Sequence, residues 1–100
     1  MFAGVFRFSF DEAVPIEDAE MTLHLGMLAA EGLFGKPRVA MEFSYEIQPF
    51  DNFIDVDGLT EVGVAVARIF AGLLLREFGD AAFRITNLPS HDSLNHEVAA

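Results

Sequence analysis

Cysteine is absent from this 100-residue sequence, and so is tryptophan. Without cysteine, the chain forms no disulfide, performs no thiol chemistry and offers no thiolate to zinc or to an iron–sulfur cluster. Long apolar runs are also missing, since none approaches the ~18 to 20 residues that a transmembrane helix needs. The first residues lack the basic segment of a signal peptide. From these absences we expect a cytoplasmic protein without a membrane segment.

Positive charge is scarce, with Lys and Arg together numbering 6 against 16 Asp and Glu, for a formal net charge of -10. Such a chain repels the phosphate backbone of nucleic acids and the headgroups of anionic lipids. We therefore expect neither nucleic acid nor a membrane surface as a partner. Apolar residues make up 52% of the chain, which excludes an intrinsically disordered protein.

Alternating apolar side chains predict strands. The alternation over Phe2–Phe10 predicts a first strand with a phenylalanine-rich inner face. A second alternation, over Arg38–Gln48, predicts a strand that turns through Pro49–Asn52 into a short returning strand over Phe53–Asp57. The alternation resumes over Ala82–Asn87, where Phe83 and Ile85 are expected to point inward.

Two helices are predicted between these strands. Pro15 suits the first helical position, and acidic residues follow it where the helix dipole favours them, so the first helix is expected over Ile16–Leu33. Gly35 followed by Pro37 is a stop signal. Thr60 or Asp57 can cap a second helix that runs to Phe78 and ends at Gly79.

The predicted order is therefore β-α-β-β-α-β in one α+β domain over residues 1–88. Right-handed crossovers place both helices on one face of a four-stranded antiparallel sheet with the order 4-1-3-2, which is a ferredoxin-like arrangement. The other face of the sheet is expected to be open. From Pro89 onward the periodicity disappears, so residues 89–100 are expected to form a flexible polar tail.

Both predicted helices carry more apolar residues than contact with one sheet requires. On the second helix, the stripe expected against the sheet is Val62, Val66, Ile69 and Leu73. Apolar residues that face elsewhere are Met21, Leu25 and Leu28 on the first helix and Val64, Ala71 and Leu75 on the second. Small soluble monomers seldom leave large apolar patches uncovered. The leading hypothesis is a non-catalytic interaction or assembly module that self-associates or binds a protein partner through these helix faces. The alternative is a monomer whose core uses all of this surface.

A second hypothesis is a small-molecule-binding protein or cofactor-free enzyme with a phenylalanine-lined pocket between the sheet and the helices. Arg7 and Arg84 would be neighbours on the open face of the sheet, with Asp55 on the adjacent strand. Either arginine can anchor a carboxylate or a phosphate through two parallel hydrogen bonds. The same residues can also form an ordinary ladder of salt bridges across the strands.

Acidic residues offer weaker candidates for a cation site. Glu20 and His24 are four residues apart on one helix face, where they can share a metal ion or simply line a solvated surface. Four carboxylates surround the third strand: Asp51, Asp55, Asp57 and Glu61. They do not match the EF-hand spacing, and turns and helix caps account for most of them.

No recognisable catalytic motif is present. The sequence contains no G-x-S-x-G and no glycine-rich phosphate loop, and its serines have no predicted histidine and carboxylate partners. His91 and His96 near the C-terminus are only a weak hint of metal binding. We therefore predict no catalytic residue, no metal site and no cofactor.

Overall fold

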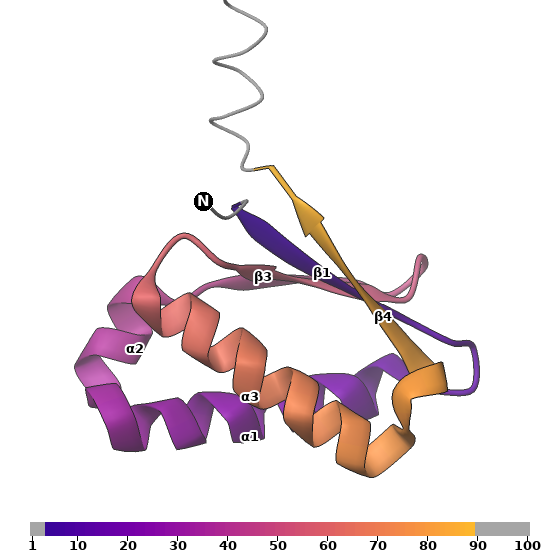
Figure 1. Ribbon diagram of the computed structural model, residues 1–100, viewed down its shortest axis with the longest axis horizontal. Coiled ribbons are helices and arrows are strands. Elements are labelled where there is room, and N and C mark those ends of the chain that lie inside the picture. The colour runs from indigo at the N-terminus through magenta and orange to yellow at the C-terminus, as the bar shows by residue number, and fades with distance from the viewer. Residues whose placement is uncertain (1–3, 90–100) are drawn as a thin grey trace, which may run out of the picture.

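The computed structural model in Figure 1 describes residues 4–89. Its elements, in chain order, are β1 (Val5–Phe10), α1 (Ile16–Phe34), α2 (Lys36–Glu42), β2 (Tyr45–Gln48), β3 (Phe53–Asp57), α3 (Glu61–Phe78), the short 3-10 helix η1 (Asp80–Ala82) and β4 (Phe83–Leu88). The predicted start of the first strand at Phe2 lies outside the described residues. So does the predicted polar tail, apart from Pro89.

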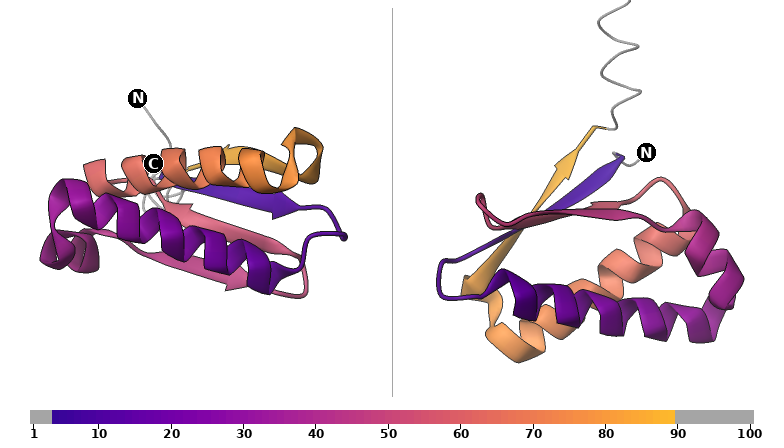
Figure 2. Two further views of the ribbon diagram at one scale, coloured as in Figure 1. Left: turned by 90° about the horizontal axis from the view of Figure 1, so that it is seen from below. Right: turned by 180° about the vertical axis from the view of Figure 1, so that it is seen from behind.

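The four strands form one antiparallel sheet in the order β2-β3-β1-β4. The long helices α1 and α3 lie side by side in a layer on one face of this sheet, and the other face is open (Figure 2). This arrangement confirms the predicted α+β class, the ferredoxin-like topology and the strand order.

The core fills the space between the sheet and the helix layer. Phe8 of β1 and Phe70 of α3 meet at its centre, with their ring centroids 4.6 Å apart. The buried apolar residues around them come from both layers and include Leu23, Ala30, Ile54, Val56, Val62, Val66 and Leu74. Because each strand alternates, the inward residues of β1 are phenylalanines while Arg7 points to the open face.

The helix boundaries agree with the sequence-based expectation. α1 begins at Ile16, directly after Pro15, and Gly35 follows its last residue with a positive φ of 90°. The Thr60 hydroxyl caps α3 by accepting the N–H of Gly63 at 2.9 Å. Gly79 ends α3 with a φ of 89°, a left-handed conformation that costs glycine little.

The strand predicted over Arg38–Gln48 is wrong in its first half. Lys36–Glu42 forms the helix α2, with Pro37 in its first turn, and only Tyr45–Gln48 is a strand. An 11-residue strand would extend beyond its partner β3, which has 5 residues, and would leave backbone groups unpaired. A helix satisfies those groups internally, and here it buries Val39 and pairs Arg38 with Glu42 at 3.0 Å.

The inward face of α3 also differs from the expected stripe. Val62 and Val66 are buried as predicted, but Phe70 and Leu74 complete the buried face in place of Ile69 and Leu73, which are only partly buried. α3 packs against α1 as well as against the sheet, and Ile69 lies beside Gly26 of α1. The helix therefore divides its apolar residues between two neighbours.

Two glycines of α3 allow a matched test of this packing. A Cβ at Gly63 would overlap the carbonyl oxygen of Asp57, whereas a Cβ at Gly72 would meet nothing within 4 Å. We expect Gly63→Ala to lower the free energy of unfolding by about 1–3 kcal/mol, because the backbone must shift. Gly72→Ala is expected to raise it by about 0.5–1 kcal/mol, since alanine favours the helix. Urea titrations at one protein concentration measure both, and equal effects would contradict the contact at Gly63.

Candidate functional site

Large apolar side chains are exposed on both long helices. Met21, Leu25 and Leu28 of α1 and Leu75 of α3 are 65%, 51%, 61% and 52% exposed. We call these four residues the outer helix face. On α1 they stand opposite Leu23, which is fully buried against the sheet. All four belong to the set predicted to face away from the core.

Charged residues of both signs flank the outer helix face. Glu17 and Asp18 lie in the first turn of α1, and Arg68 and Arg76 are exposed on α3. The two helices run antiparallel, as shown by the hydrogen bond from the Thr22 hydroxyl to the Glu77 carboxylate at 3.1 Å. Within residues 4–89, no carboxylate lies within 4 Å of either α3 guanidinium. These arginines therefore have charge available for a partner.

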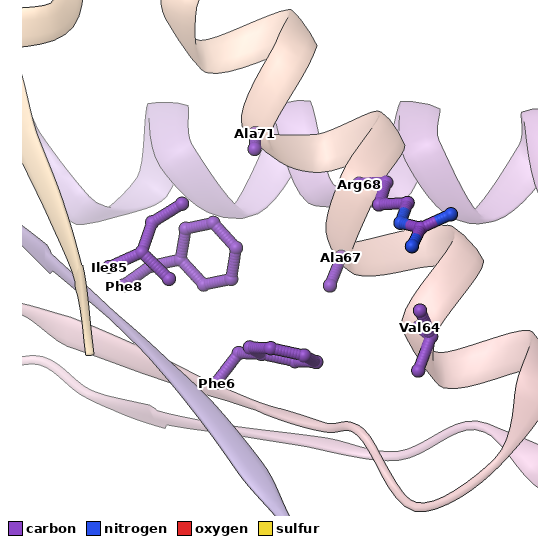
Figure 3. A pocket seen from close by; sticks show the side chains of 7 residues that line it. All are labelled: Phe6, Phe8, Val64, Ala67, Arg68, Ala71 and Ile85. Carbon is purple, nitrogen blue, oxygen red and sulfur yellow. The ribbon is translucent and has the colours of Figure 1, made fainter. Parts of the chain in front are cut away.

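An open apolar groove of about 490 Å³ runs between α3 and the sheet (Figure 3). Its lining residues are Phe6 and Phe8 of β1, Ile85 of β4, and Val64, Ala67, Arg68 and Ala71 of α3. Ile85 is on the helix side of the sheet, as predicted, yet it is 44% exposed. The groove exists because α3 packs mainly on α1, with further contacts to β3, and makes few contacts with β4.

The six residues predicted to form an interface separate into two groups. Val64 and Ala71 are half-buried in the wall of the groove, whereas Met21, Leu25, Leu28 and Leu75 are exposed. Ala71 and Leu75 are four residues apart on the same side of α3, so the two groups adjoin on this helix. Helical periodicity identified which residues avoid the centre of the core, but it could not show which neighbour each one meets.

Arg7 is held on the open face of the sheet. Its Nε and Nη2 donate to the two carboxylate oxygens of Asp55 at 2.8 and 3.0 Å, and its guanidinium lies 3.8 Å from the centroid of the Phe53 ring. The hydrogen bonds from Arg7 to Asp55 raise the pKa of Arg7 above its ordinary value. This is the salt-bridge interpretation of the predicted Arg7–Asp55 contact.

Arg84 is not directly opposite Arg7. The register pairs Arg84 with Ser9, and Arg7 with Thr86, so the arginines are diagonal neighbours on the open face. That face is the reverse of the one that forms the groove. Neither arginine is therefore positioned as the anchor of a ligand in the phenylalanine-lined groove.

Tyr45 connects the two residues that the sequence suggested as a pair on α1. Its hydroxyl donates to Glu20 at 3.2 Å and lies 2.9 Å from Nε2 of His24. Because the phenol has one proton and donates it to Glu20, its oxygen accepts from Nε2 of His24. Helix spacing suggested Glu20 and His24 but not Tyr45, which reaches them from β2.

The acidic residues around β3 are engaged separately. Asp55 binds Arg7, Asp57 accepts the N–H of Leu59 at 3.0 Å, and Glu61 accepts from Arg38 at 3.0 Å. Among residues 4–89, no three acidic or histidine side chains gather closely enough to hold a metal ion. His91 and His96 lie outside the described residues.

The titration of Tyr45 provides a test of its environment. Burial, followed by the hydrogen bond and the charge of Glu20, raises the pKa of Tyr45 above its ordinary value of about 10. Since Tyr45 is the only tyrosine and tryptophan is absent, ultraviolet absorbance reports its ionisation directly. We expect the midpoint of the Tyr45 titration to fall to about 10 in denaturant. With Glu20→Gln it should fall only partway, because the burial of Tyr45 remains.

The raised pKa of Tyr45 also makes the stability of the fold depend on pH. A pKa raised by folding favours the protonated phenol, so the stabilisation is complete below about pH 10 and is lost as the pH rises through the folded pKa. A native midpoint at or below the denatured one would contradict the contacts of Tyr45.

Arg7→Lys tests the contact on the open face. Lysine keeps the charge but loses the paired hydrogen bonds and the planar contact with Phe53, so we expect the free energy of unfolding to fall by about 0.5–1 kcal/mol. Arg84→Lys, on the same face of the sheet, is the matched control and is expected to leave the free energy of unfolding unchanged. Urea denaturation that shows equal effects for the two variants would contradict the role of Arg7.

Apolar exposure is the main feature that these surfaces offer to a partner. It occurs on the outer helix face and along the groove beside β4, and four further exposed apolar side chains lie elsewhere: Leu33, Met41, Phe50 and Leu59. None of the helices within residues 4–89 is long and apolar enough to cross a membrane. Comparison with known proteins finds no protein family, no curated protein and no solved structure that matches this chain.

Proposed function

We propose that this protein is a non-catalytic assembly module that self-associates through its outer helix face. The observation that supports the proposal is the exposure of Met21, Leu25, Leu28 and Leu75 on the two long helices, each more than half accessible. Covering about 600 Å² of apolar surface contributes on the order of 15 kcal/mol. Association costs about 4 to 15 kcal/mol, so covering this area offsets a cost of that size.

The charges beside this face favour a second copy as the partner. α1 presents Glu17 and Asp18, and α3 presents Arg68 and Arg76. In a two-fold contact, the acidic turn of α1 in each copy can approach the arginines of α3 in the other, so every favourable contact occurs twice. A chain with a net charge of -10 is itself an acidic partner for these arginines.

A small-molecule-binding protein or cofactor-free enzyme is less well supported. Its proposed anchors, Arg7 and Arg84, lie on the sheet face that is turned away from the groove. The cytoplasmic location expected from the composition stays a prediction.

Leu25→Glu tests the outer helix face, because it places a charge in the middle of the proposed contact. We expect the wild type to sediment as an oligomer at micromolar concentration and Leu25→Glu to have a lower mass while keeping its circular dichroism spectrum. Phe50→Glu is the matched control: Phe50 is 99% exposed in the β2–β3 turn, and its replacement should not change the mass. A monomeric wild type would refute the proposal.

A further inference from the structure

β4 forms an edge of the sheet, and within the described residues it pairs only with β1. Its central residues, Arg84–Asn87, are all exposed. Proteins usually protect such an edge with proline, with charged side chains (lysine above all), with a bulge or with a covering segment. β4 contains neither proline nor lysine, its one charged residue is Arg84, and its register with β1 runs without a bulge from Phe83 to Leu88. Among residues 4–89, nothing therefore prevents the outer side of the strand from pairing.

The free backbone groups of β4 can be identified from its pairing with β1. In an antiparallel ladder, residues that exchange hydrogen bonds alternate with residues that do not. The Asp11 N–H donates to the Ala82 carbonyl at 2.8 Å, and the register continues this pairing with Arg84 opposite Ser9. Residues 82, 84, 86 and 88 thus turn their N–H and C=O groups toward β1. Phe83, Ile85 and Asn87 turn their N–H and C=O groups to the outside.

From this geometry we infer that a second copy of the chain pairs with β4 antiparallel, about a two-fold axis at Ile85. Residues directly opposite each other point to the same face of a sheet, so Ile85 faces Ile85 of the second copy, and Phe83 faces Asn87 of the second copy. In this register every free N–H and C=O of the three outward residues finds a partner. The result is one continuous sheet across both copies.

The two neighbouring registers are less favourable than the register centred on Ile85. An axis at Thr86 sets Phe83 opposite Pro89 of the second copy, and proline has no N–H to donate. An axis at Arg84 sets two arginines directly opposite each other, which is destabilising. The strand sequence therefore selects the register centred on Ile85.

Charge favours this edge over the other one. Arg84 is the only charged residue of β4, whereas the opposite edge strand, β2, carries Glu46 and lies beside Glu20. Two copies that each carry a net charge of -10 repel each other at most surfaces, and β4 is free of acidic residues.

The apolar groove provides a second favourable contact. Ile85 lies at the β4 border of the groove next to its cross-strand neighbour Phe8, and Phe6 lies below them in Figure 3. Pairing at Ile85 joins the grooves of the two copies into one apolar floor between their α3 helices. This interface centres on β4 and not on the outer helix face, and it goes beyond the assembly proposed above. Two-fold contacts through both surfaces would join more than two copies.

Disulfide cross-linking of two single variants tests the register, because the natural sequence has no cysteine to interfere. Position 84 of one copy lies opposite position 86 of the other in a pair without hydrogen bonds, with Cα atoms about 4.5 Å apart, which suits a disulfide. We expect an equimolar mixture of Arg84→Cys and Thr86→Cys to give a linked dimer under mild oxidation, and each variant alone to give none. Linkage of Thr86→Cys alone, or no linkage in the mixture, would overturn the inference.

Asn87→Pro gives an independent measurement. It removes an N–H that faces the outside and no hydrogen bond to β1, so we expect it to weaken association by roughly tenfold or more. Asn87→Ala keeps the N–H and is expected to associate like the wild type. Equal association of the two variants would contradict edge pairing. If Asn87→Pro does not fold, the cross-linking decides alone.

The outcomes separate the two interfaces. Failure to cross-link in a protein that still sediments as an oligomer refutes pairing through β4 and leaves the outer helix face. Cross-linking that persists with Leu25→Glu added to both variants supports β4 pairing independently of that face.

Discussion

The contact between Phe8 of β1 and Phe70 of α3 determines how the helix layer lies on the sheet. With the two rings 4.6 Å apart at the centre of the core, α3 presents Val66, Phe70 and Leu74 to the interior. Ile69 then lies beside α1, Val64 and Ala71 line the groove, and Leu75 points outward. This one rotation of α3 decides which apolar residues are buried and which are available to a partner.

The same placement makes the two edges of the sheet different. The β2 edge is short, carries Glu46, and is joined to α1 through the hydrogen bonds of Tyr45 with Glu20 and His24. The β4 edge is longer, lacks acidic residues and borders an apolar groove. The edge of a strand offers a row of unpaired N–H and C=O groups. Hydrogen bonds to these groups fix the direction and register of a partner strand, which apolar contact alone does not.

The few positive charges are divided between two roles. Arg7 and Arg38 are held by carboxylates of their own chain and connect neighbouring elements: β1 with β3, and α2 with α3. Arg68 and Arg76 stand beside the outer helix face, and Arg84 lies on β4. In a strongly acidic chain, placing these arginines at the two proposed contacts reduces the repulsion between copies where they approach most closely.

Local chemistry in the sequence determined most of the secondary structure. The alternation of β1 and β3, the Thr60 cap and the glycines after α1 and α3 act within a few residues, so they could be recognised without the fold. The same holds for the outward position of Met21, Leu25 and Leu28, and for the reach of Arg7 to Asp55. Topology followed from the order of these elements and the handedness of their connections.

Only the tertiary structure decided the rest. Val39, Met41 and Phe43 alternate as a strand would, yet residues 36–42 are helical because β3 is too short to pair with them. Ile85 alternates as a core residue would, yet it stays accessible because α3 packs mainly against α1 and makes few contacts with β4. A periodic pattern shows which side of an element is apolar, but whether that side is buried depends on the length and position of neighbouring elements.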